Sequence, residues 1–336
     1  MAILPLGKLP PDLLASMLAQ APVNDPRVLV KPGIGLDCAV IDAGDRYLVL
    51  KSDPITFATD DIGWYLVQVN SNDIATTGGI PRWLMVTMLL PEGKTTPSLL
   101  DKINQQLFEA CREKRISLIG GHTEITYGID RPILSATLIG EVDKDKLITP
   151  AGTAPGDKIL LTKGVPIEAT AILAKEFPER LTATLTPAEI ESAQNYLFEP
   201  GISVMRDARI ATAAGHVTAM HDPTEGGLAG AIWELAEACN LRFEIDPSAV
   251  PIPEISAKIC DTFGLNPLET IASGALLLTA KSADVDAIIQ ALAEHEILCV
   301  EIGDVQAGEM GVWQTGGTLL NRPERDELAR FYESLD

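Results

Sequence analysis

A carboxylate on the apolar face of a helix is the most informative chemical feature of the sequence. The segment from Asp61 to Thr76 has the spacing of an amphipathic helix, and Asp73 falls on its apolar stripe near the C-terminal end. A lone ionised carboxylate is costly there, because its surroundings are apolar and the helix dipole disfavours negative charge. Asp37 and Asp53 stand at the edges of expected strands, so the three carboxylates would gather around Mg²⁺, which prefers oxygen ligands. A backbone hydrogen bond or an ion pair with a lysine or arginine is the alternative for Asp73.

Glycine-rich turns offer a second kind of chemistry, because their backbone N–H groups can hold phosphate. Gly33 and Gly35 precede Asp37, and we expect them to expose N–H groups at that point. The run Gly120-Gly121-His122-Thr123-Glu124 is expected to form a turn after a buried strand, where it combines flexible backbone with polar side chains. An ordinary turn is the alternative for each run, and a structural hydrogen bond is the alternative role of His122.

The clearest anion site of the sequence is expected in the second half. The run His221-Asp222-Pro223-Thr224-Glu225-Gly226-Gly227 leads directly into a helix expected over 227–239. Its glycines would let an anion approach the unpaired N–H groups of the helix N-terminus, where the helix dipole favours negative charge. Simple capping of the helix by Asp222 or Thr224 is the alternative.

Composition limits the classes of function. The chain has 336 residues and 46% hydrophobic content, which is enough for two packed domains. Its formal charge of −21 and the lack of a basic cluster exclude a nucleic-acid partner. No apolar run approaches the roughly 20 residues of a membrane span, so we expect a cytoplasmic protein without a membrane partner. The five scattered cysteines indicate neither a disulfide framework nor a zinc site.

The elements that must position these residues fall into two α+β halves with mixed strand order. A Pro/Gly-rich linker at 149–157 separates an expected first domain, 1–150, from a second domain, 151–336. The first half is expected to begin with a hairpin of strands at 38–42 and 47–52, followed by the helix with Asp73 at 61–76. A second helix is expected at 97–114, and three further strands are expected at 82–90, 116–120 and 133–142. In the second half, strands near 158–162, 217–220, 241–245, 275–280 and 299–305 are interspersed with helices.

In their order along the chain, these residues resemble the superfamily of aminoimidazole ribonucleotide (AIR) synthase, HypE, selenophosphate synthetase and thiamine-monophosphate kinase. Each segment alone is weakly specific, whereas their joint order over the whole chain is specific. The segments that carry the resemblance are 33–41, 52–54, 70–81, 120–124, 222–228 and 272–274. Asp222-Pro223-Thr224 and the helix with Asn72-Asp73 are most similar to the branch of the hydrogenase maturation factor HypE.

The resemblance implies a two-domain α+β, PurM-like fold. Its N-terminal mixed sheet with helices would dimerise into a β-barrel, and its C-terminal αβ domain would cover a cleft that binds ATP. The N-terminal domain would bind Mg²⁺ and ATP, with the metal held by Asp37, Asp53 and Asp73. The expected protein is a cytoplasmic homodimeric enzyme that uses Mg-ATP to phosphorylate and activate a carbonyl- or amide-type oxygen of a small-molecule or protein acceptor.

The resemblance also assigns roles to the polar turns. Asp222 and Thr224 would face the acceptor or the γ-phosphate, and His122 is a third candidate catalytic residue. Contacts with the nucleotide are expected from Gly33, Gly35, Asn72, Asp73, Gly120, Gly121, Thr123, Glu124, Gly226 and Gly227. A kinase of the thiamine-monophosphate type and a non-catalytic nucleotide-binding sensor or scaffold are the alternative functions.

The sequence departs from the family pattern at three points. HypE ends in a cysteine that carries a carbamoyl group, whereas this sequence ends at 331–336 without one, so a different acceptor is expected. Leu36 replaces the acid that commonly precedes Asp37, which removes one potential metal ligand. His122 stands where several relatives carry Asp or Glu, so a second metal is expected to bind differently or not at all.

Overall fold

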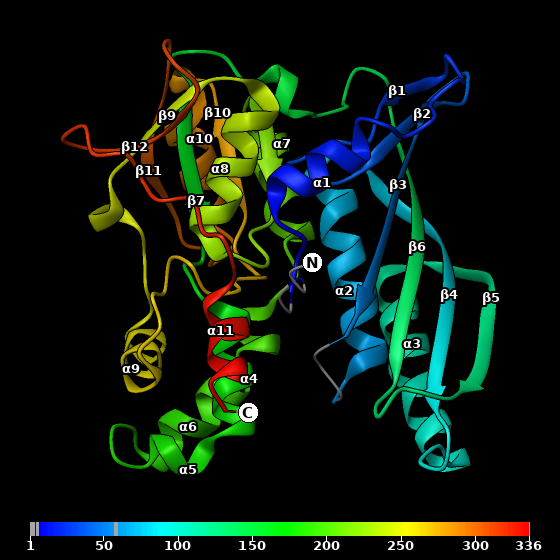
Figure 1. Ribbon diagram of the computed structural model, residues 1–336. Helices are drawn as coiled ribbons and strands as arrows, with labels where there is room; N and C mark the ends of the chain where they lie inside the picture. Colours follow the sequence, from blue (N-terminus) through cyan, green and yellow to red (C-terminus); the bar gives the residue numbers. More distant parts are fainter. Residues whose placement is uncertain (1–3, 5–6, 57–59, 336) are drawn as a thin grey trace. The chain divides into compact units, whose positions relative to one another are not determined.

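The chain folds into two compact units (Figure 1). The computed structural model describes residues 4, 7–56 and 60–335. We call Val23–Lys31 with Asp37–Leu147 the N-terminal unit, and the described part of 1–22, 32–36 and 148–336 the C-terminal unit. The described residues of 1–22 and residues 32–36, expected in the first domain, therefore belong to the C-terminal unit. The assignment of ATP binding and dimerisation to the first domain stays a prediction.

The N-terminal unit is a six-stranded mixed sheet with two helices. The strand order is β1-β2-β3-β6-β4-β5, and all neighbours are antiparallel except β4 and β5. Helix α2 contacts β3, β6, β4 and helix α3. The elements are β1 (Val28–Val30), β2 (Ala39–Asp42), β3 (Tyr47–Ile55), α2 (Ile62–Thr76), β4 (Ile80–Pro91), α3 (Pro97–Lys114), β5 (Ser117–Thr126) and β6 (Ile133–Val142).

Local sequence explains the elements that carry the expected site. The hairpin of β2 and β3 is confirmed, with Ala39 opposite Leu50 and Asp42 opposite Tyr47. Helix α2 is confirmed over Ile62–Thr76, and nearly all of its residues are buried between the sheet and α3. Helix α3 begins after Thr96, whose side chain accepts from the Leu99 N–H at 3.1 Å.

The glycine run at 120–124 is a strand instead of the expected turn. Gly120 to Glu124 lie inside β5, and β5 forms the exposed edge of the sheet rather than a buried strand. The pairing with β4 shifts by one residue between Leu84 and Met85, which is a β-bulge. Gly121 has a φ of +146°, and a Cβ there would lie 1.8 Å from the Val86 carbonyl oxygen. Glycine is therefore required at this bulge by close backbone approach, which sequence alone cannot distinguish from a turn.

The C-terminal unit contains a second six-stranded sheet, with the order β12-β9-β11-β7-β10-β8. Only β9 and β12 pair in parallel; the other neighbours are antiparallel. The strands are β7 (Lys158–Thr162), β8 (Val217–His221), β9 (Arg242–Ile245), β10 (Leu277–Ala280), β11 (Cys299–Gln306) and β12 (Gly311–Gln314). The α-helices are α1 (Pro11–Leu18), α4 (Ile167–Glu176), α5 (Pro178–Leu181), α6 (Pro187–Gln194), α7 (Met205–Ala214), α8 (Gly227–Cys239), α9 (Glu254–Phe263), α10 (Val285–Ala293) and α11 (Glu327–Glu333).

Among its described residues, the C-terminal unit buries at least two apolar clusters. Helix α8 packs Leu228, Ile232 and Leu235 into a cluster with side chains of the sheet, which confirms the helix expected at 227–239. A second cluster joins α4, α6, α9 and α11 around the aromatic side chains of Phe177, Phe263 and Phe331. The five cysteines, all of them among the described residues, form no disulfide. Within the part of the chain that the structure describes, no helix is both long and apolar enough for a membrane span.

Candidate functional site

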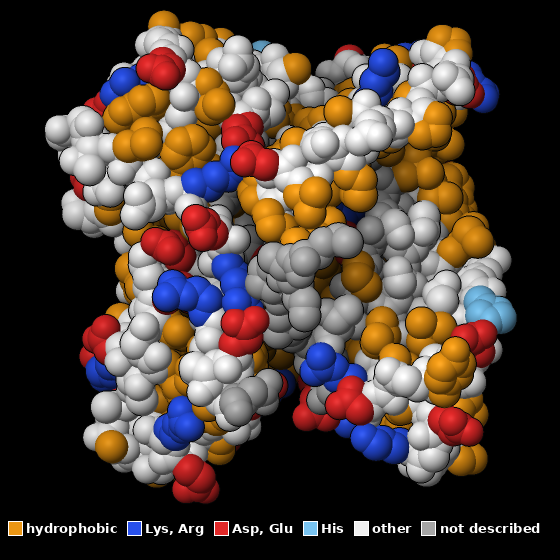
Figure 2. Space-filling view, viewed as in Figure 1, with side chains coloured by type: hydrophobic (Ala, Val, Ile, Leu, Met, Phe, Trp, Pro, Cys, Tyr) orange, Lys and Arg blue, Asp and Glu red, His pale blue; other side chains and the backbone are white. Residues whose placement is uncertain are grey.

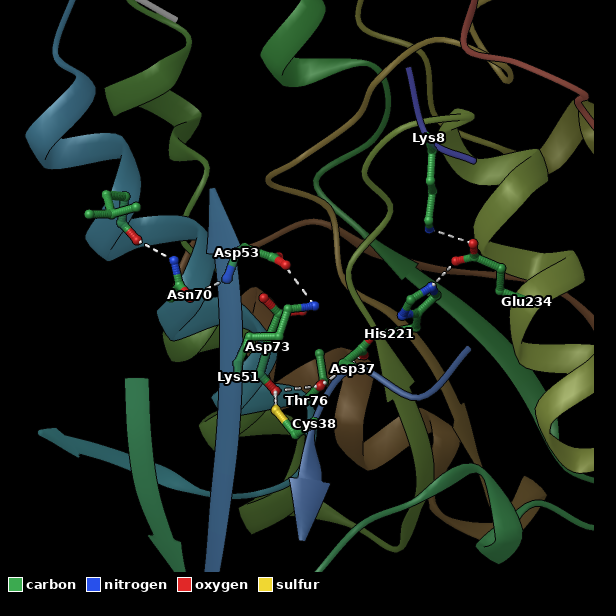
Figure 3. A network of polar contacts seen from close by, with 11 residues as sticks. Lys8, Asp37, Cys38, Lys51, Asp53, Asn70, Asp73, Thr76, His221 and Glu234 are labelled. Atoms are coloured by element: carbon green, nitrogen blue, oxygen red, sulfur yellow. Dashed lines mark hydrogen bonds and ion pairs between the residues drawn. The ribbon is translucent and has the colours of Figure 1, made fainter. Parts of the chain in front are cut away.

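The N-terminal unit brings the three expected carboxylates, Asp37, Asp53 and Asp73, around one lysine (Figure 3). We call these three residues the carboxylate cluster. Asp37 lies in the loop before β2, Asp53 lies in β3, and Asp73 lies near the end of α2. Asp73 is only 4% exposed, so the expected burial of this carboxylate is confirmed. Thr76 lies one turn after Asp73 and donates to Asp37 Oδ2 at 3.1 Å, which ties the loop to the helix.

The lysine is Lys51, which the sequence analysis does not single out. Its Nζ lies 3.0 Å from Asp73 Oδ1 and 3.2 Å from Asp53 Oδ2. Lys51 and Asp53 are two residues apart in β3, so their side chains point to the same face of the strand. Burial lowers the pKa of Lys51, but the negative charges of the cluster outweigh it and raise that pKa well above its usual range. The ion pair considered as an alternative for Asp73 is thus present.

The cluster fits a divalent cation in its ligand chemistry and in its charge. Three carboxylates are hard oxygen donors of the kind that Mg²⁺ binds. Three negative charges and one ammonium leave a net charge of −2. The Lys51 ammonium contacts one oxygen of Asp73 and one oxygen of Asp53, so a metal that bound through these two oxygens would displace it.

Two asparagines of α2 differ in what their side chains reach. Asn70 Oδ1 accepts from the backbone N–H of Asp53 at 3.2 Å, and its Nδ2 donates to the Leu66 carbonyl at 2.9 Å. Asn70 therefore connects α2 to the strand that carries Asp53, a role that the sequence analysis did not assign. Asn72 is fully buried, and its expected contact with a nucleotide stays a prediction.

Within one chain, the polar residues of β5 lie away from the carboxylate cluster. Strands β6 and β4 separate β5 from β3, which is about 14 Å of sheet at the usual spacing between strands. His122 and Glu124 are exposed, and His122 Nε2 lies 3.1 Å from Glu124 Oε2. The N-terminal unit thus does not bring Gly120, Gly121, His122, Thr123 and Glu124 to the aspartates of the same chain.

In the C-terminal unit, the expected acceptor-side residues follow β8. Asp222 is buried and Thr224 is half-buried. His221, the last residue of β8, lies with Nε2 3.0 Å from Glu234 Oε2, and the Lys8 ammonium lies 2.6 Å from Glu234 Oε1 (Figure 3). Burial raises the pKa of Glu234, but His221 and Lys8 outweigh it and hold that pKa at about 2.

The N-terminus of α8 is occupied by groups of the chain itself. The Gly226 N–H donates to Asp326 Oδ2 at 2.7 Å, and the Gly227 N–H donates to the Thr224 carbonyl at 3.0 Å. Gly227 has a φ of +62°, and a Cβ there would lie 2.6 Å from the Leu268 carbonyl oxygen. The expected unpaired N–H groups are therefore not found at Gly226 and Gly227, because Gly227 admits a neighbouring chain segment and Asp326 supplies the capping carboxyl group. The expected nucleotide contacts of both glycines stay predictions.

Gly35 has a similar role in packing. Its φ is +69°, and a Cβ there would lie 2.2 Å from the Glu234 carbonyl oxygen of α8. Both residues belong to the C-terminal unit. The loop with Gly33 and Gly35 is a turn, as expected, but close approach to α8 already explains Gly35, and the expected phosphate contacts of both glycines stay predictions.

Two buried carboxyl groups near the α8 N-terminus were missed by the sequence analysis. Glu168 lies in the first turn of α4 and is 6% exposed. Burial raises its pKa to about 7 against a hydrogen bond with Ser273, and the charges of Glu225 and Asp326 add to the rise. Burial likewise raises the pKa of Asp326 to about 7. No local pattern marks either residue, because burial and charged neighbours come from distant segments.

The C-terminal unit also contains a pocket of about 530 Å³. Its lining includes Lys163, Tyr196, Arg206 and His295. As far as the described residues show, none of the expected site residues lines this pocket.

Comparison with known proteins identifies the family. The family model described as "AIR synthase related protein, N-terminal domain" matches residues 35–142, and that of the C-terminal domain matches residues 154–314. A putative hydrogenase expression/formation protein of Methanocaldococcus jannaschii is 31% identical over 281 residues, which cover 80% of this chain and 79% of that protein. The chain belongs to the AIR synthase-related family. The expected resemblance is confirmed, and with it the expected class of an ATP-dependent enzyme related to HypE.

Further matches place this AIR synthase-related protein near HypE in sequence and fold. The carbamoyl dehydratase HypE of Cupriavidus necator is 29% identical over 265 residues, which cover 77% of this chain and 70% of that protein. A structure of HypE in complex with ATP has a TM-score of 0.68 at 22% identity and covers 93% of this chain and 91% of its own. The structure of AaThiL complexed with AMPPCP and TMP has a TM-score of 0.72 at 19% identity and covers 94% of both chains. The expected two-domain α+β, PurM-like fold is thereby confirmed.

Proposed function

We propose that this AIR synthase-related protein uses Mg-ATP to phosphorylate and thereby activate a carbonyl- or amide-type oxygen of its acceptor. The observation that carries the proposal is the carboxylate cluster, which collects three acidic side chains from a loop, a strand and a helix of the N-terminal unit. Its net charge of −2 suits one divalent cation. Family membership and the ATP and AMPPCP complexes of its structural neighbours support a nucleotide as the partner of that cation.

The chain's own residues would hold and orient the reactants. Bound Mg²⁺ would neutralise the triphosphate and the charge that develops during phosphoryl transfer. Asp37, Asp53 and Asp73 would be its ligands, with Asp37 oriented by Thr76 and the backbone of Asp53 held by Asn70. In the C-terminal unit, Asp222 and Thr224 would face the acceptor or the γ-phosphate.

The metal role is tested by calorimetry with a non-hydrolysable ATP analogue, with and without Mg²⁺. We expect Asp73→Asn to weaken Mg²⁺-dependent binding by at least about tenfold, because a buried metal ligand loses its charge. Asp42→Asn is the matched control, since Asp42 lies on the same sheet and pairs with Lys144 on the surface. Unchanged Mg²⁺-dependent binding in Asp73→Asn would remove Asp73 from the site and contradict the proposal.

A small-molecule kinase is the second candidate function, because the neighbour with a TM-score of 0.72 carries both an ATP analogue and TMP. The two functions differ in the fate of the γ-phosphate. A kinase leaves it on the product, whereas activation followed by dehydration or ligation releases it as free phosphate. After reaction with an acceptor and ATP that carries a labelled γ-phosphate, chromatography shows whether the label is on the acceptor or in free phosphate. This result distinguishes the two functions.

We further propose that the protein is a homodimer formed through β5 of the N-terminal unit. This strand is the exposed edge of its sheet and carries exposed apolar side chains, including Ile119 at 55% and Ile125 at 61%. Figure 2 shows hydrophobic side chains on the side where Figure 1 places β5. An apolar edge strand is a ready template for pairing with another chain, and a PurM-like β-barrel dimer would cover it. His122 and Glu124 would then lie at the interface, where a second copy can complete the site.

A further inference from the structure

We propose that Lys51 is a built-in counter-cation of the carboxylate cluster, which competes with Mg²⁺ and so sets how tightly the cluster binds the metal. This inference rests on the proposed Mg-ATP function and adds a residue that controls its metal step.

Competition follows from the geometry of the contacts. The Lys51 ammonium lies 3.0 Å from Asp73 Oδ1 and 3.2 Å from Asp53 Oδ2, so it lies between the two carboxylates (Figure 3). A Mg²⁺ ion binds carboxylate oxygens at about 2.1 Å, and if it bound these two oxygens it would take the place of the ammonium. Two cations this close together repel each other, so the ammonium opposes the binding of a metal to the cluster.

Lys51 also explains how the cluster is stable before metal binds. Without a cation, the carboxylate of Asp73, which is only 4% exposed, would face the carboxylates of Asp37 and Asp53. Like charges in such surroundings are strongly unfavourable, and a buried carboxylate is stable when it is paired. The side chain of Lys51 is 19% exposed, and its flexible four-carbon stem lets the ammonium leave when a divalent cation arrives.

The same contacts predict opposite effects of Lys51 on folding and on metal binding. Removal of the ammonium leaves the cluster with a charge of −3 in place of −2, which destabilises the metal-free protein. It also leaves the carboxylate oxygens available to a divalent cation. A lysine with a purely structural role would lower stability without tightening metal binding.

The test compares Mn²⁺ binding and thermal unfolding of the full-length protein without nucleotide. Electron paramagnetic resonance of free Mn²⁺ gives the affinity, and melting in EDTA or in Mg²⁺ gives the stability. We expect Lys51→Met to bind Mn²⁺ at least about tenfold more tightly than wild type. We expect its melting temperature to fall by several degrees in EDTA and to recover in Mg²⁺. Lys51→Arg keeps the positive charge and should bind Mn²⁺ no more tightly than wild type.

The matched control is Lys144→Met, which removes the partner of Asp42 from an exposed ion pair of the same unit, with Nζ 2.8 Å from Oδ2. It should change neither Mn²⁺ affinity nor the effect of Mg²⁺ on melting. Equal or weaker Mn²⁺ binding by Lys51→Met overturns the inference. If Lys51→Met does not fold in EDTA, its Mn²⁺ affinity is measured by refolding it at increasing Mn²⁺ concentrations. This affinity and that of Lys51→Arg then decide whether the Lys51 charge weakens metal binding. The proposed function fails on a separate result, namely nucleotide binding that is independent of Mg²⁺.

Discussion

Burial of Glu168 makes the stability of the C-terminal unit depend on pH. The pKa of this carboxyl group is about 7 in the folded chain against an ordinary value of 4.5, mainly because burial disfavours its charge. Between these values the folded state holds a proton that the unfolded state has lost. Stability from this group is therefore present at low pH and is lost as pH rises to about 7.

Replacement of Glu168 by glutamine removes this pH dependence. Relative to wild type, Glu168→Gln should gain up to about 3 kcal/mol in the free energy of unfolding between pH 5 and pH 8, which urea denaturation at the two pH values measures. Glu189→Gln is the control, because hydrogen bonds from Thr186 lower the pKa of half-buried Glu189 to about 2, which lies below the tested range. Its pH-dependent stability lies below about pH 5, so that variant should differ from wild type by the same amount at pH 5 and at pH 8. If Glu168→Gln differed from wild type by the same free energy of unfolding at both pH values, the raised pKa of Glu168 would be contradicted.

The partners of single residues mark the limit of what sequence alone predicts. The burial of Asp73 follows from helical spacing within a single segment. The partner of Asp73 is Lys51, which lies on β3. The two-residue spacing of Lys51 and Asp53 predicts only that these two side chains share one face of a strand. Which helix covers that face is decided by tertiary packing, so the ion pair is visible only in the structure.

At the scale of elements, β5 shows why paired glycines can belong to a strand. The β-bulge opposite Leu84 and Met85 brings the backbone of Gly121 against Val86, and its φ of +146° suits glycine alone. Gly120 differs in both respects: a Cβ there would have open space, and its φ is not in the left-handed region. The two neighbours therefore form a natural pair for comparison.

Alanine should distinguish these two glycines. Gly121→Ala should destabilise the N-terminal unit by at least about 2 kcal/mol, because the new methyl group would overlap the Val86 carbonyl and the backbone would be strained. Gly120→Ala should stay within about 1 kcal/mol of wild type. Thermal unfolding followed by circular dichroism measures both. Similar melting temperatures for the two variants would contradict the bulged register of β5.

The N-terminus of α8 shows a second limit at this scale. Local spacing predicts helix α8 and its apolar face. It does not predict which group accepts the hydrogen bond at the start of this helix. Asp326 stands 100 residues after Gly226, yet its carboxylate accepts from that N–H at 2.7 Å and from the Leu328 N–H at 2.8 Å. One side chain thus caps both α8 and α11. A glycine-rich helix start is typical of an anion site, and here a carboxyl group of the chain itself accepts from the Gly226 N–H.

At the scale of the whole molecule, the order of weak motifs is more informative than any one of them. The segments from Gly33 to Gly274 occur in the order of the AIR synthase-related family, and the family models and the structural neighbours confirm that resemblance. The acceptor does not follow in the same way, because it depends on side chains that differ among relatives of one fold. Physical measurement of the products must supply it.

The proposed dimer makes the edge strand β5 the main determinant of assembly. Replacement of both Ile119 and Ile125 by lysine should give a monomer at micromolar concentration, because charge on an exposed edge opposes strand pairing. Analytical ultracentrifugation should find wild type at twice the 35.9 kDa of one chain. Leu319→Lys is the control, since Leu319 is 51% exposed in the C-terminal unit and should leave the dimer intact.

Salt should strengthen this assembly. Each chain carries a formal charge of −21, so two copies repel each other over the screening length of about 10 Å at 0.1 M salt. Apolar edge pairing is insensitive to screening, whereas the repulsion is reduced by it. The dimer dissociation constant should therefore fall as the salt concentration rises. A dissociation constant that rises with salt would assign the interface to ion pairs instead of β5, and a wild-type monomer would contradict the dimer itself.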